Sequence, residues 1–383
     1  MPTGLIPELC GKSYQVGTFN LRVLLVSSIY PPDIGGPATF IPEFASYLQR
    51  NGCKVTVVTL SDYISGSRLE NQIEVNYIKR SKLRLLRMVS TVRTLVDLIP
   101  KNDFLLCNGL YFETAIALKF QPHNATAKVV GDLAWERYKN SGGMLSIEDY
   151  NKQKVTSLNR RVFSWSLSQF QNVYSPSVAL SKIVDSWGIG RKALVIENGV
   201  KCSPEKTEPS QHLYDVATIT RLVPWKNNDL LIRACKILNC KLVIVGDGPE
   251  MQNLVTLAAD LGVNATFTGQ VGKSETNLIL AQSKIFALVS SYEGQSFALT
   301  EAMMAGKPVL VSGVSGNASI VSHEETGLIC EMNEKDISLK MARLLTDIDL
   351  AAELGSKAKS FAETNFCRDK QFEKAFRMLR GNG

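Results

Sequence analysis

Metal-ligating residues are scarce in this chain. It has 383 residues but only three His, and its eight Cys stand singly, at positions 10, 53, 107, 202, 235, 240, 330 and 367. Structural metal sites need closely spaced Cys and His ligands, so we predict no zinc site and no other metal site. We expect all eight Cys to be reduced, mostly structural thiols, as in a cytosolic protein.

Long apolar segments are also missing. No stretch approaches the roughly 18 uncharged apolar residues that a membrane-spanning helix needs. The first twenty residues, MPTGLIPELCGKSYQVGTFN, have no long apolar core, so no signal peptide is expected. Low-complexity segments and solenoid repeats are absent too. We therefore expect a cytoplasmic protein, or one held peripherally at the inner face of a membrane.

The composition is that of a packed globular protein, and its charge is uneven. Apolar residues make up 45% and charged residues 21%, and 383 residues are enough for two domains. The net charge is +7, with 23 Lys+Arg against 15 Asp+Glu in residues 1–200, and 20 against 21 in residues 201–383. The basic half is the place for an anionic partner or a membrane surface. Nucleic acid is not expected, because no RNA-binding motif and no dense basic run with aromatics occurs.

Short apolar runs alternate with helical patterns along the whole chain. LRVLLVSSIY (21–30) predicts a buried strand, IPEFASYLQRNG (41–52) a helix and CKVTVVTL (53–60) the next strand of a parallel sheet. Further strands are predicted at 104–110, 127–133, 172–177, 193–200, 215–222, 241–248, 265–271, 284–291 and 307–313. The polar segment 201–214, with two prolines, is expected to link two domains. The fold class is therefore α/β, with two Rossmann-like, doubly wound parallel-sheet domains facing across a cleft.

The stretch EGQSFALTE (293–301) places two carboxylates around a helix start. The helix is expected to begin near Ser296 or Phe297, which leaves the amides from Gly294 to Phe297 free to bind an anion. Glu301, about one turn inside, could accept hydrogen bonds from a ribose diol, and Glu293 would face a sugar attached to the phosphate. Alternatively, Glu293 caps the helix and Glu301 is solvated.

Other strand-end loops carry further candidates. The stretch TRLVPWKNND contains Arg221 and Lys226, two cations that could bind a diphosphate. Alternatively, this stretch is a solvated loop that carries two charges and binds no ligand. Gly246 lies in the strand-end turn GDGPE, and Gly35 and Gly36 would let the backbone of the first domain approach a ligand closely.

Asp132 follows the strand predicted at 127–133. It is a candidate for contact with the donor sugar or the acceptor, or equally for capping the helix LAWERY. Trp135, Glu136 and Arg137 in that helix could meet an acceptor sugar, or Trp135 could pack in the interior.

SKLRLLRMVSTVRTLV (81–96) predicts a basic amphipathic helix. Leu85, Val89, Val92 and Val96 share one face, and Arg80, Arg84 and Arg87 share another. Such a helix could touch an anionic membrane through residues 80–96, or could pack on the protein with a solvated basic face.

The ordered set of these motifs resembles one enzyme family. TRLVPWKN, LVIVGDGPE, FTGQV, SSYEGQSFALTEAMMAGKPVLVS and SGNASIVSHEETGLIC, with VLLVSSIYPPDIGGPATF and VIENGV in the first half, are similar to the retaining GT-B glycosyltransferases of family 4, or glycosyl transferases group 1. The resemblance covers roughly residues 20 to 365. It implies an acceptor-binding domain at 1–200, a donor-binding domain at 201–358 and a C-terminal helix, 359–383, that crosses back to the first domain.

The resemblance also implies residue roles. Arg221 and Lys226 would neutralise a nucleoside diphosphate without a metal or other cofactor, Glu301 would hold the ribose, and Gly36 would approach the diphosphate across the cleft. The remaining donor contacts would be Glu293 and the amides of Gly294, Gln295, Ser296 and Phe297. The chain departs from the family pattern at Thr220, Gln295, Ser296 and Ser319, and has Gly131-Asp132 where many members have His.

The function implied is retaining transfer of a sugar from a UDP- or GDP-sugar to a glycan or lipid-linked acceptor, in the setting of bacterial surface polysaccharide synthesis. The alternatives are an epimerase or phosphorylase of the same fold, or a nucleotide-binding module without catalysis. A pyridoxal phosphate lysine motif, which would favour a phosphorylase, is not found.

Overall fold

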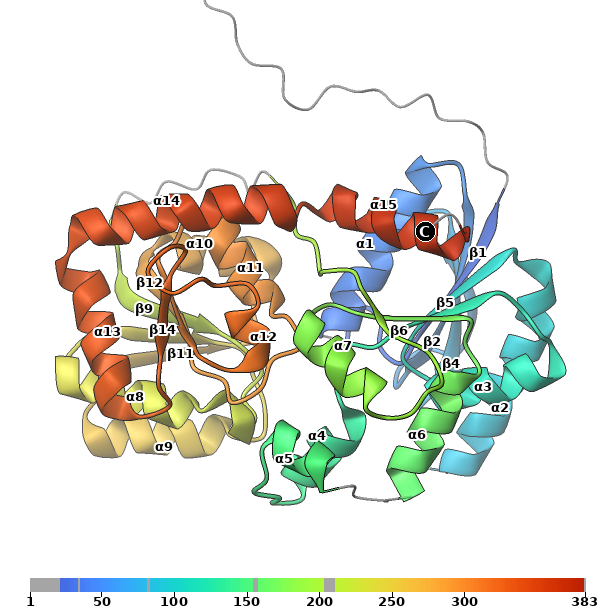
Figure 1. Ribbon diagram of the computed structural model, residues 1–383, viewed down its shortest axis with the longest axis horizontal. Helices are drawn as coiled ribbons and strands as arrows, with labels where there is room; N and C mark the ends of the chain where they lie inside the picture. The colour runs from blue at the N-terminus through green and yellow to red at the C-terminus, as the bar shows by residue number, and fades with distance from the viewer. Residues whose placement is uncertain (1–20, 34, 81–82, 154–157, 203–210, 382–383) are drawn as a thin grey trace, which may run out of the picture.

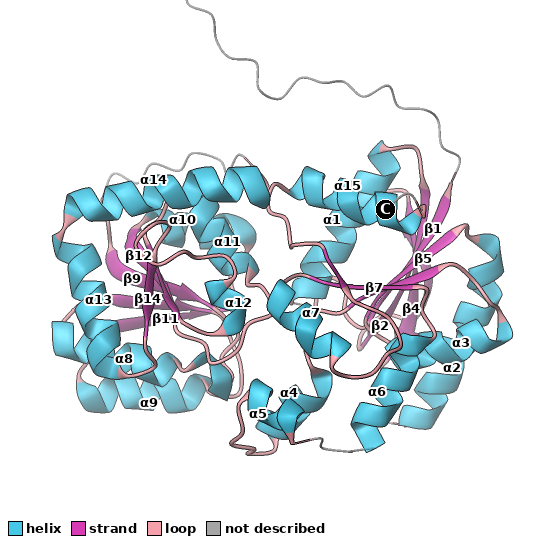
Figure 2. Ribbon diagram, in the orientation of Figure 1, coloured by secondary structure: helices cyan, strands magenta, loops and turns pink. Residues whose placement is uncertain are grey.

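A computed structural model gives the structure of the protein and describes residues 21–33, 35–80, 83–153, 158–202 and 211–381. Two α/β domains lie side by side, each with a twisted sheet between layers of helices (Figures 1 and 2). Within these residues, none of the helices combines the length and the apolar character needed to cross a bilayer.

The first domain contains an eight-stranded sheet in the order β3-β4-β2-β1-β5-β6-β7-β8. All neighbouring pairs are parallel except β3 and β4, which form an antiparallel edge. The strands are β1 (Arg22–Ser27), β2 (Lys54–Ser61), β3 (Gly66–Glu70), β4 (Ile73–Lys79), β5 (Phe104–Asn108), β6 (Ala125–Lys128), β7 (Asn172–Ser175) and β8 (Leu194–Val195). The helices are α1 (Gly36–Arg50), α2 (Arg84–Leu98), η1 (Ile99–Lys101), α3 (Tyr111–Phe120), α4 (Leu133–Asn140), α5 (Ile147–Lys152), α6 (Leu158–Ser168) and α7 (Val178–Asp185).

The second domain contains a six-stranded, all-parallel sheet in the order β11-β10-β9-β12-β13-β14. Its strands are β9 (Tyr214–Ile219), β10 (Leu242–Val245), β11 (Ala265–Gly269), β12 (Ser283–Leu288), β13 (Val309–Ser312) and β14 (Leu328–Cys330). Its helices are η2 (Pro224–Lys226), α8 (Asn228–Leu238), α9 (Met251–Leu261), α10 (Lys273–Ala281), α11 (Phe297–Met304), α12 (Ser315–Ala318), α13 (Glu334–Thr346) and α14 (Ile348–Asn365), and α15 (Arg368–Leu379) follows.

Continuous apolar runs explain the central strands. Five of the six residues of β1 and all four of β10 are buried, as expected for parallel strands covered on both faces. Helix α1 begins at Gly36, five residues earlier than predicted, and Pro37 lies in its first turn. Proline is accommodated there because the first helical amides have no partner inside the helix.

The chain crosses between the domains twice, and both crossings meet. After Val200 it enters the second domain, and after α14 it returns as α15, whose side chains Phe372 and Phe376 pack on the first sheet (Figure 1). The expected segment 359–383 is therefore divided, since α14 continues to Asn365. The N–H of Val200 donates to the carbonyl of Phe366 at 2.9 Å.

One prediction about the cysteines is wrong. Cys202 and Cys367 form a disulfide, with a Cα–Cα distance of 5.2 Å, where the two crossings lie side by side. The pairing was not visible in the sequence because 165 residues separate the two thiols and only the tertiary fold joins them. Cys53, Cys107, Cys235, Cys240 and Cys330 are free and buried, and Cys10 lies outside the described residues.

Both sheets reverse their strand order beside their first strand, between β1 and β5 and between β9 and β12. Adjacent strand-end loops separate at such a point and leave room for a ligand at the carboxyl ends of the strands. The loops from the two reversal points meet at the domain junction, because a Cβ on Gly36 would lie 3.6 Å from the ring of Phe297.

Candidate functional site

Arg221, Lys226 and Glu293 come together at the reversal point of the second sheet. Lys226 Nζ lies 2.5 Å from Glu293 Oε1, and both side chains are largely buried. The Ser290 hydroxyl donates to the same carboxylate oxygen at 2.7 Å. Arg221 is exposed, and its guanidinium has no hydrogen-bond or ion-pair partner among the described residues. The loop thus holds one fixed cation and one that is available to a ligand.

Helix α11 begins where the sequence predicts, and Ser296 caps it. The Ser296 hydroxyl accepts from the amide of Leu299 at 3.3 Å. The amides of Phe297 and Ala298 have no partner within the described part of the chain. Glu293 therefore does not cap this helix, and two amides at its positive end remain for an anion.

Glu301 lies one turn into α11 and is not simply solvated. Its Oε1 forms an ion pair with Lys273, at the start of α10, and the side chain is about one-quarter exposed. One carboxylate oxygen is used in this pair, and the other is left for a hydroxyl.

The glycines at the junction allow close backbone contacts. A Cβ on Gly294 would lie 2.6 Å from the carbonyl oxygen of Val130 in the first domain, so the two domains touch here. Gly35 and Gly36 begin α1 opposite Phe297. Gly246, with φ of 130°, packs against the carbonyl of Thr220, and a Cβ would approach that oxygen to 2.0 Å. The close packing of two strand-end loops therefore explains why residue 246 is a glycine.

The backbone amide of Gln295 was predicted to hold the donor, and the Gln295 side chain has a separate structural role. Its Oε1 accepts from the Asn198 amide at 2.6 Å, and its Nε2 donates to the Asn198 carbonyl at 3.1 Å. Lys128, buried under the Phe40 ring, donates to Asn198 Oδ1 at 2.8 Å, and burial holds the pKa of this lysine well below its usual value. The Gln295 side chain thus joins the second domain to the first.

Asp132 was predicted either to contact the donor sugar or the acceptor as a catalytic residue, or to cap the helix that follows, and the structure shows it as the cap of α4. It is fully buried and caps α4, with Oδ1 accepting from the amides of Ala134 and Trp135 at 3.0 and 3.1 Å. Its Oδ2 accepts from Arg160 at 2.7 Å. Because both oxygens are satisfied inside the first domain, Asp132 holds α4 in place and does not face a sugar.

Helix α4 is the part of the first domain that covers the cation loop. The buried ring of Trp135 lies 5.7 Å from Trp225, in η2, and 5.0 Å from Tyr292, next to Glu293. Trp135 is thus a packing residue and does not meet a sugar.

Glu136 was named only as a possible acceptor contact, yet it is the most perturbed carboxyl of this region. Burial, and then the charge of Asp132, raise its pKa to about 7 against the opposing pull of Lys226 and Arg221. Its burial depends on the packing of α4 against the second domain, and Lys226 and Arg221 lie far from it in sequence, so no local pattern could have singled it out.

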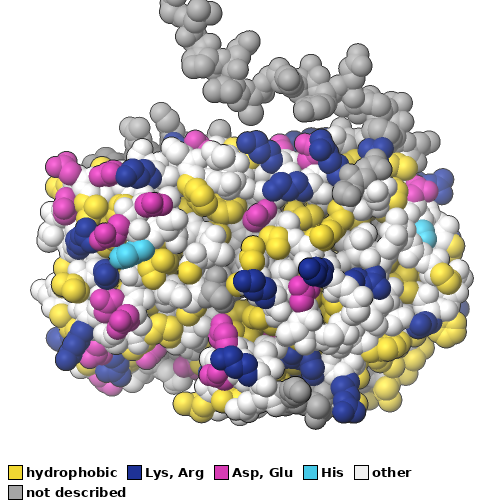
Figure 3. Space-filling view, in the orientation of Figure 1, with side chains coloured by type: hydrophobic (Ala, Val, Ile, Leu, Met, Phe, Trp, Pro, Cys, Tyr) yellow, Lys and Arg dark blue, Asp and Glu magenta, His cyan; other side chains and the backbone are white. Residues whose placement is uncertain are grey.

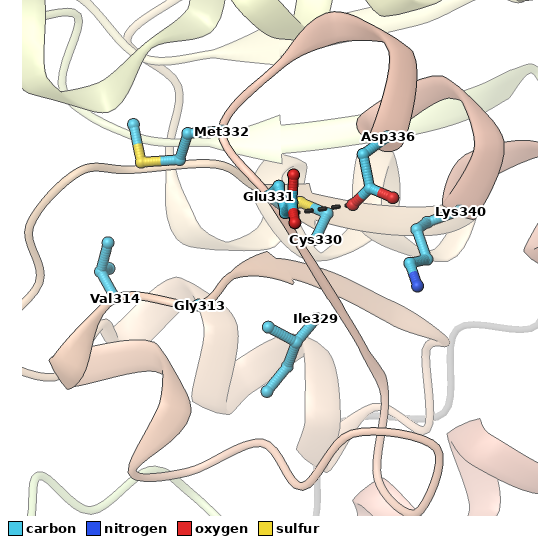
Figure 4. A pocket seen from close by; sticks show the side chains of 8 residues that line it. All are labelled: Gly313, Val314, Ile329, Cys330, Glu331, Met332, Asp336 and Lys340. Atoms are coloured by element: carbon cyan, nitrogen blue, oxygen red, sulfur yellow. Dashed lines mark hydrogen bonds between the residues drawn. The ribbon is translucent and has the colours of Figure 1, made fainter.

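One cavity lies away from this site. It has a volume of about 570 Å³ and lies at the carboxyl ends of β13 and β14, beside the edge of the second sheet (Figure 4). Its lining residues are Gly313, Val314, Ile329, Cys330, Glu331, Met332, Asp336 and Lys340. None of the predicted site residues is among them, and the cations that would bind a diphosphate are at the reversal point instead.

The sequence of this chain is similar to those of known proteins. Residues 203–361 match the family described as Glycosyl transferases group 1. The chain is 25% identical over 389 residues to the GDP-mannose-dependent alpha-(1-6)-phosphatidylinositol monomannoside mannosyltransferase of Mycobacterium tuberculosis, covering 94% of this chain and 98% of that protein. The second domain is therefore similar to the glycosyl transferases of group 1.

Solved structures share the fold of this chain. Sucrose-phosphate synthase from Thermosynechococcus elongatus superimposes with a TM-score of 0.79 at 18% identity, covering 94% of this chain and 99% of that one. Anabaena HepE in complex with UDP-glucose gives a TM-score of 0.77 at 19% identity, covering 94% and 100%. The predicted GT-B fold is thus confirmed over both domains.

Proposed function

We propose that this glycosyltransferase moves a hexosyl group from a nucleoside diphosphate sugar to a lipid-linked acceptor, with retention at the anomeric carbon. The observation that carries the proposal is the meeting of Arg221, Lys226 and the free α11 amides at one reversal point of the sheet. Charges and amide dipoles that converge in this way suit the diphosphate, which gains negative charge as its bond to the sugar breaks.

Two cations and a helix terminus can do the work that a divalent metal does in other transferases. Arg221 offers a planar set of donors for two phosphate oxygens, and Lys226 offers a point charge. Lys226 is already held in position by Glu293, so this cation need not be ordered for the reaction. We therefore propose metal-independent transfer without a further cofactor.

We propose that Glu301 holds the ribose. It lies on α11 one turn beyond the amides of Phe297 and Ala298, so a nucleotide with its phosphates on these amides would bring its ribose along the helix. A carboxylate accepts two hydrogen bonds from a vicinal diol.

Retention is proposed from the state of Glu293. Its carboxylate is paired with Lys226 and hydrogen-bonded to Ser290, so it is a weak nucleophile. We propose that the acceptor attacks the face from which the diphosphate leaves, and that the departing phosphate takes the acceptor's proton.

The relatives favour a lipid-linked acceptor. The Mycobacterium tuberculosis relative acts on a phosphatidylinositol mannoside with GDP-mannose, by its name. We propose GDP- or UDP-hexose as the donor, and surface glycolipid or polysaccharide synthesis as the setting. A lipid-linked acceptor requires the protein to reach a membrane surface.

Helix α2 carries apolar side chains that are exposed to solvent. The predicted apolar face is divided, since Val92 and Val96 pack on the core of the first domain while Leu85 and Val89 are 72% and 61% exposed. Leu86 is 63% exposed as well. The end of the first domain where α2 lies carries clustered hydrophobic side chains (Figure 3), whereas charges of both signs are interspersed elsewhere on that face.

We propose that this end of α2 docks on an anionic membrane surface. Its exposed leucines would enter the headgroup region, and Arg84 and Arg93, both exposed, would lie near anionic lipid. The protein would then be peripherally bound, with the acceptor site of the first domain close to the lipid.

Replacing Leu85 and Leu86 together by serine is expected to reduce sedimentation with anionic phosphatidylglycerol vesicles about tenfold, since each leucine loses apolar area that lipid would cover. Leu339→Ser, at a 67% exposed leucine on α13, is the matched control and should bind as the parent protein does. Equal sedimentation of the double variant and the parent would contradict the docking surface.

Thermal unfolding with nucleotides tests the donor site. GDP or UDP at about a hundred times its dissociation constant should stabilise the protein by about 2.7 kcal/mol, with EDTA present as well as without it. Guanosine and uridine, which lack phosphates, are the controls and should give little shift. Absence of any shift, or a shift that EDTA abolishes, would contradict the proposed site or its independence of metal.

A further inference from the structure

The carboxyl of Glu136 occupies an unusual position at the domain junction. It lies against Gly131, where an added Cβ would stand 2.4 Å from Glu136 Oε1 and 3.8 Å from the Tyr292 hydroxyl. A side chain at position 131 would therefore take the volume that the Glu136 carboxyl now fills. The absence of a side chain at Gly131 thus leaves room for the Glu136 carboxyl near Tyr292 of the second domain.

This carboxyl has no partner of its own. Within the described part of the chain, no hydrogen bond or ion pair involves its oxygens, although the side chain is only partly exposed. Glu293, by contrast, is paired with Lys226 and bonded to Ser290. A partly exposed carboxyl without a partner at a domain junction is free to contact a ligand bound between the domains.

Glu136 faces the same cations that would hold the diphosphate. Helix α4 is fixed on the cation loop by Trp135, which packs on Trp225 and Tyr292. The ionisable groups that act on or are affected by Glu136 are Asp132 and Arg137 on its own element, Arg221 and Lys226 beside η2, Tyr292 after β12 and Tyr111 on α3. Only Arg221 and Lys226, across the junction, and Arg137 favour its ionised form.

A diphosphate would change this balance. Its negative charge would occupy the field of Arg221 and Lys226 and would oppose a second negative charge at Glu136. A neutral carboxylic acid at Glu136 would not repel the diphosphate. Its O–H could also donate a hydrogen bond to a phosphate oxygen or a sugar hydroxyl.

We propose that Glu136 forms the first-domain wall of the donor site and contacts the bound diphosphate sugar as a neutral acid, so that donor binding takes up a proton. The proposal rests on the proposed function, since it requires a diphosphate at Arg221 and Lys226. The proton comes from solvent and moves to a Glu136 oxygen, and no bond of the donor changes in this step.

The affinity for the nucleotide should depend on pH. In the free protein the pKa of Glu136 is about 7, and the added negative charge of the diphosphate raises it further. Binding is therefore strongest below pH 7 and weakens as pH rises above 7, because the proton must then be taken up. Between pH 6 and pH 8 the affinity should fall about tenfold more in the parent protein than in a variant without this acid.

Calorimetric titration of the full chain with GDP and with UDP, in HEPES and in Tris at pH 7.5, tests the proposal. The difference in heat between the buffers gives the protons taken up. Glu136→Gln should take up clearly fewer protons than the parent, and because both bind the same nucleotide, the titration of the nucleotide itself cancels.

Two further variants sharpen the test. Gly131→Ala should displace the flexible carboxyl of Glu136 and give the same loss of proton uptake, since no strained φ forbids alanine there. Glu148→Gln, at an exposed acid on the neighbouring helix α5, is the control and should match the parent. Equal proton uptake by the parent and Glu136→Gln would overturn the inference alone, whereas failure of both nucleotides to bind the parent would overturn the proposed function and the inference with it.

Discussion

The variant Arg221→Ala is expected to lose about 10²–10³-fold in kcat/KM while it unfolds at the same temperature as the parent protein. Arg221 is exposed, and its side chain has no hydrogen-bond or ion-pair partner among the described residues, so its removal leaves no buried group without a partner. The loss should come from the transition state, where the departing diphosphate carries the most charge. Steady-state kinetics with the nucleotide sugar, together with a thermal melt, would measure both quantities.

Arg233→Ala provides the matched control. Arg233 is an exposed arginine on α8 of the same domain, and its removal should change neither kinetics nor stability. Normal turnover of Arg221→Ala would remove Arg221 from the site. Lys226 is less suitable for this comparison, because its loss also leaves the buried Glu293 without its cation.

Asp132→Ala is expected to lower the free energy of unfolding by about 3–5 kcal/mol, because it leaves the guanidinium of Arg160 largely buried without its carboxylate. Arg160 is 15% exposed and Asp132 is fully buried, so solvent cannot replace the lost partner. The variant also loses the cap of α4, the helix that covers the cation loop. Chemical denaturation, fitted to a two-state transition of the first domain, would give the difference.

Asp347→Ala separates the two contributions. Asp347 caps α14 in the same way, with Oδ1 accepting from Leu350 at 3.0 Å, but it is exposed and has no ion-pair partner among the described residues. Its replacement should cost only about 1 kcal/mol, the usual value of a cap. If Asp132→Ala were as stable as the parent and merely inactive, the original prediction of a catalytic Asp132 would be restored.

The strands show how far local patterns determine this fold. The runs predicted at 241–248 and 284–291 became β10 and β12 with similar starting points, because central strands of parallel sheets are buried on both faces and need an uninterrupted apolar run. The start of α11 was equally predictable, since Ser296 follows the common chemistry of a helix cap.

The positions of Arg221, Lys226 and Glu293 could also be anticipated from the order of the elements. Each follows a strand of the same sheet, and parallel strands bring their carboxyl ends to one edge. Their meeting needed only the additional fact that β9 and β12 are neighbours at the reversal of strand order.

Side chains with distant partners could not be interpreted from local patterns. The link that the Gln295 side chain makes between the domains was missed, because its partner Asn198 lies 97 residues away in sequence. Asp132 shows the same problem, because the arginine that fixes it is 28 residues away and no pattern links the two. Glu136 was undervalued because its pKa is set by burial at a domain junction.

The sequence by itself determined the alternation of strands and helices, the two doubly wound sheets and the strand-end loops that carry Arg221, Lys226, Glu293 and Glu301, since these follow from the local pattern of apolar residues and turn chemistry. Only the tertiary structure decided the disulfide between Cys202 and Cys367, the use of Gln295 as a link between domains, and the enclosure of Glu136 opposite two cations. These features depend on which surfaces of the two domains come into contact. Burial and electrostatic fields at such a contact arise from residues that are distant in sequence, so no single stretch of the chain predicts them.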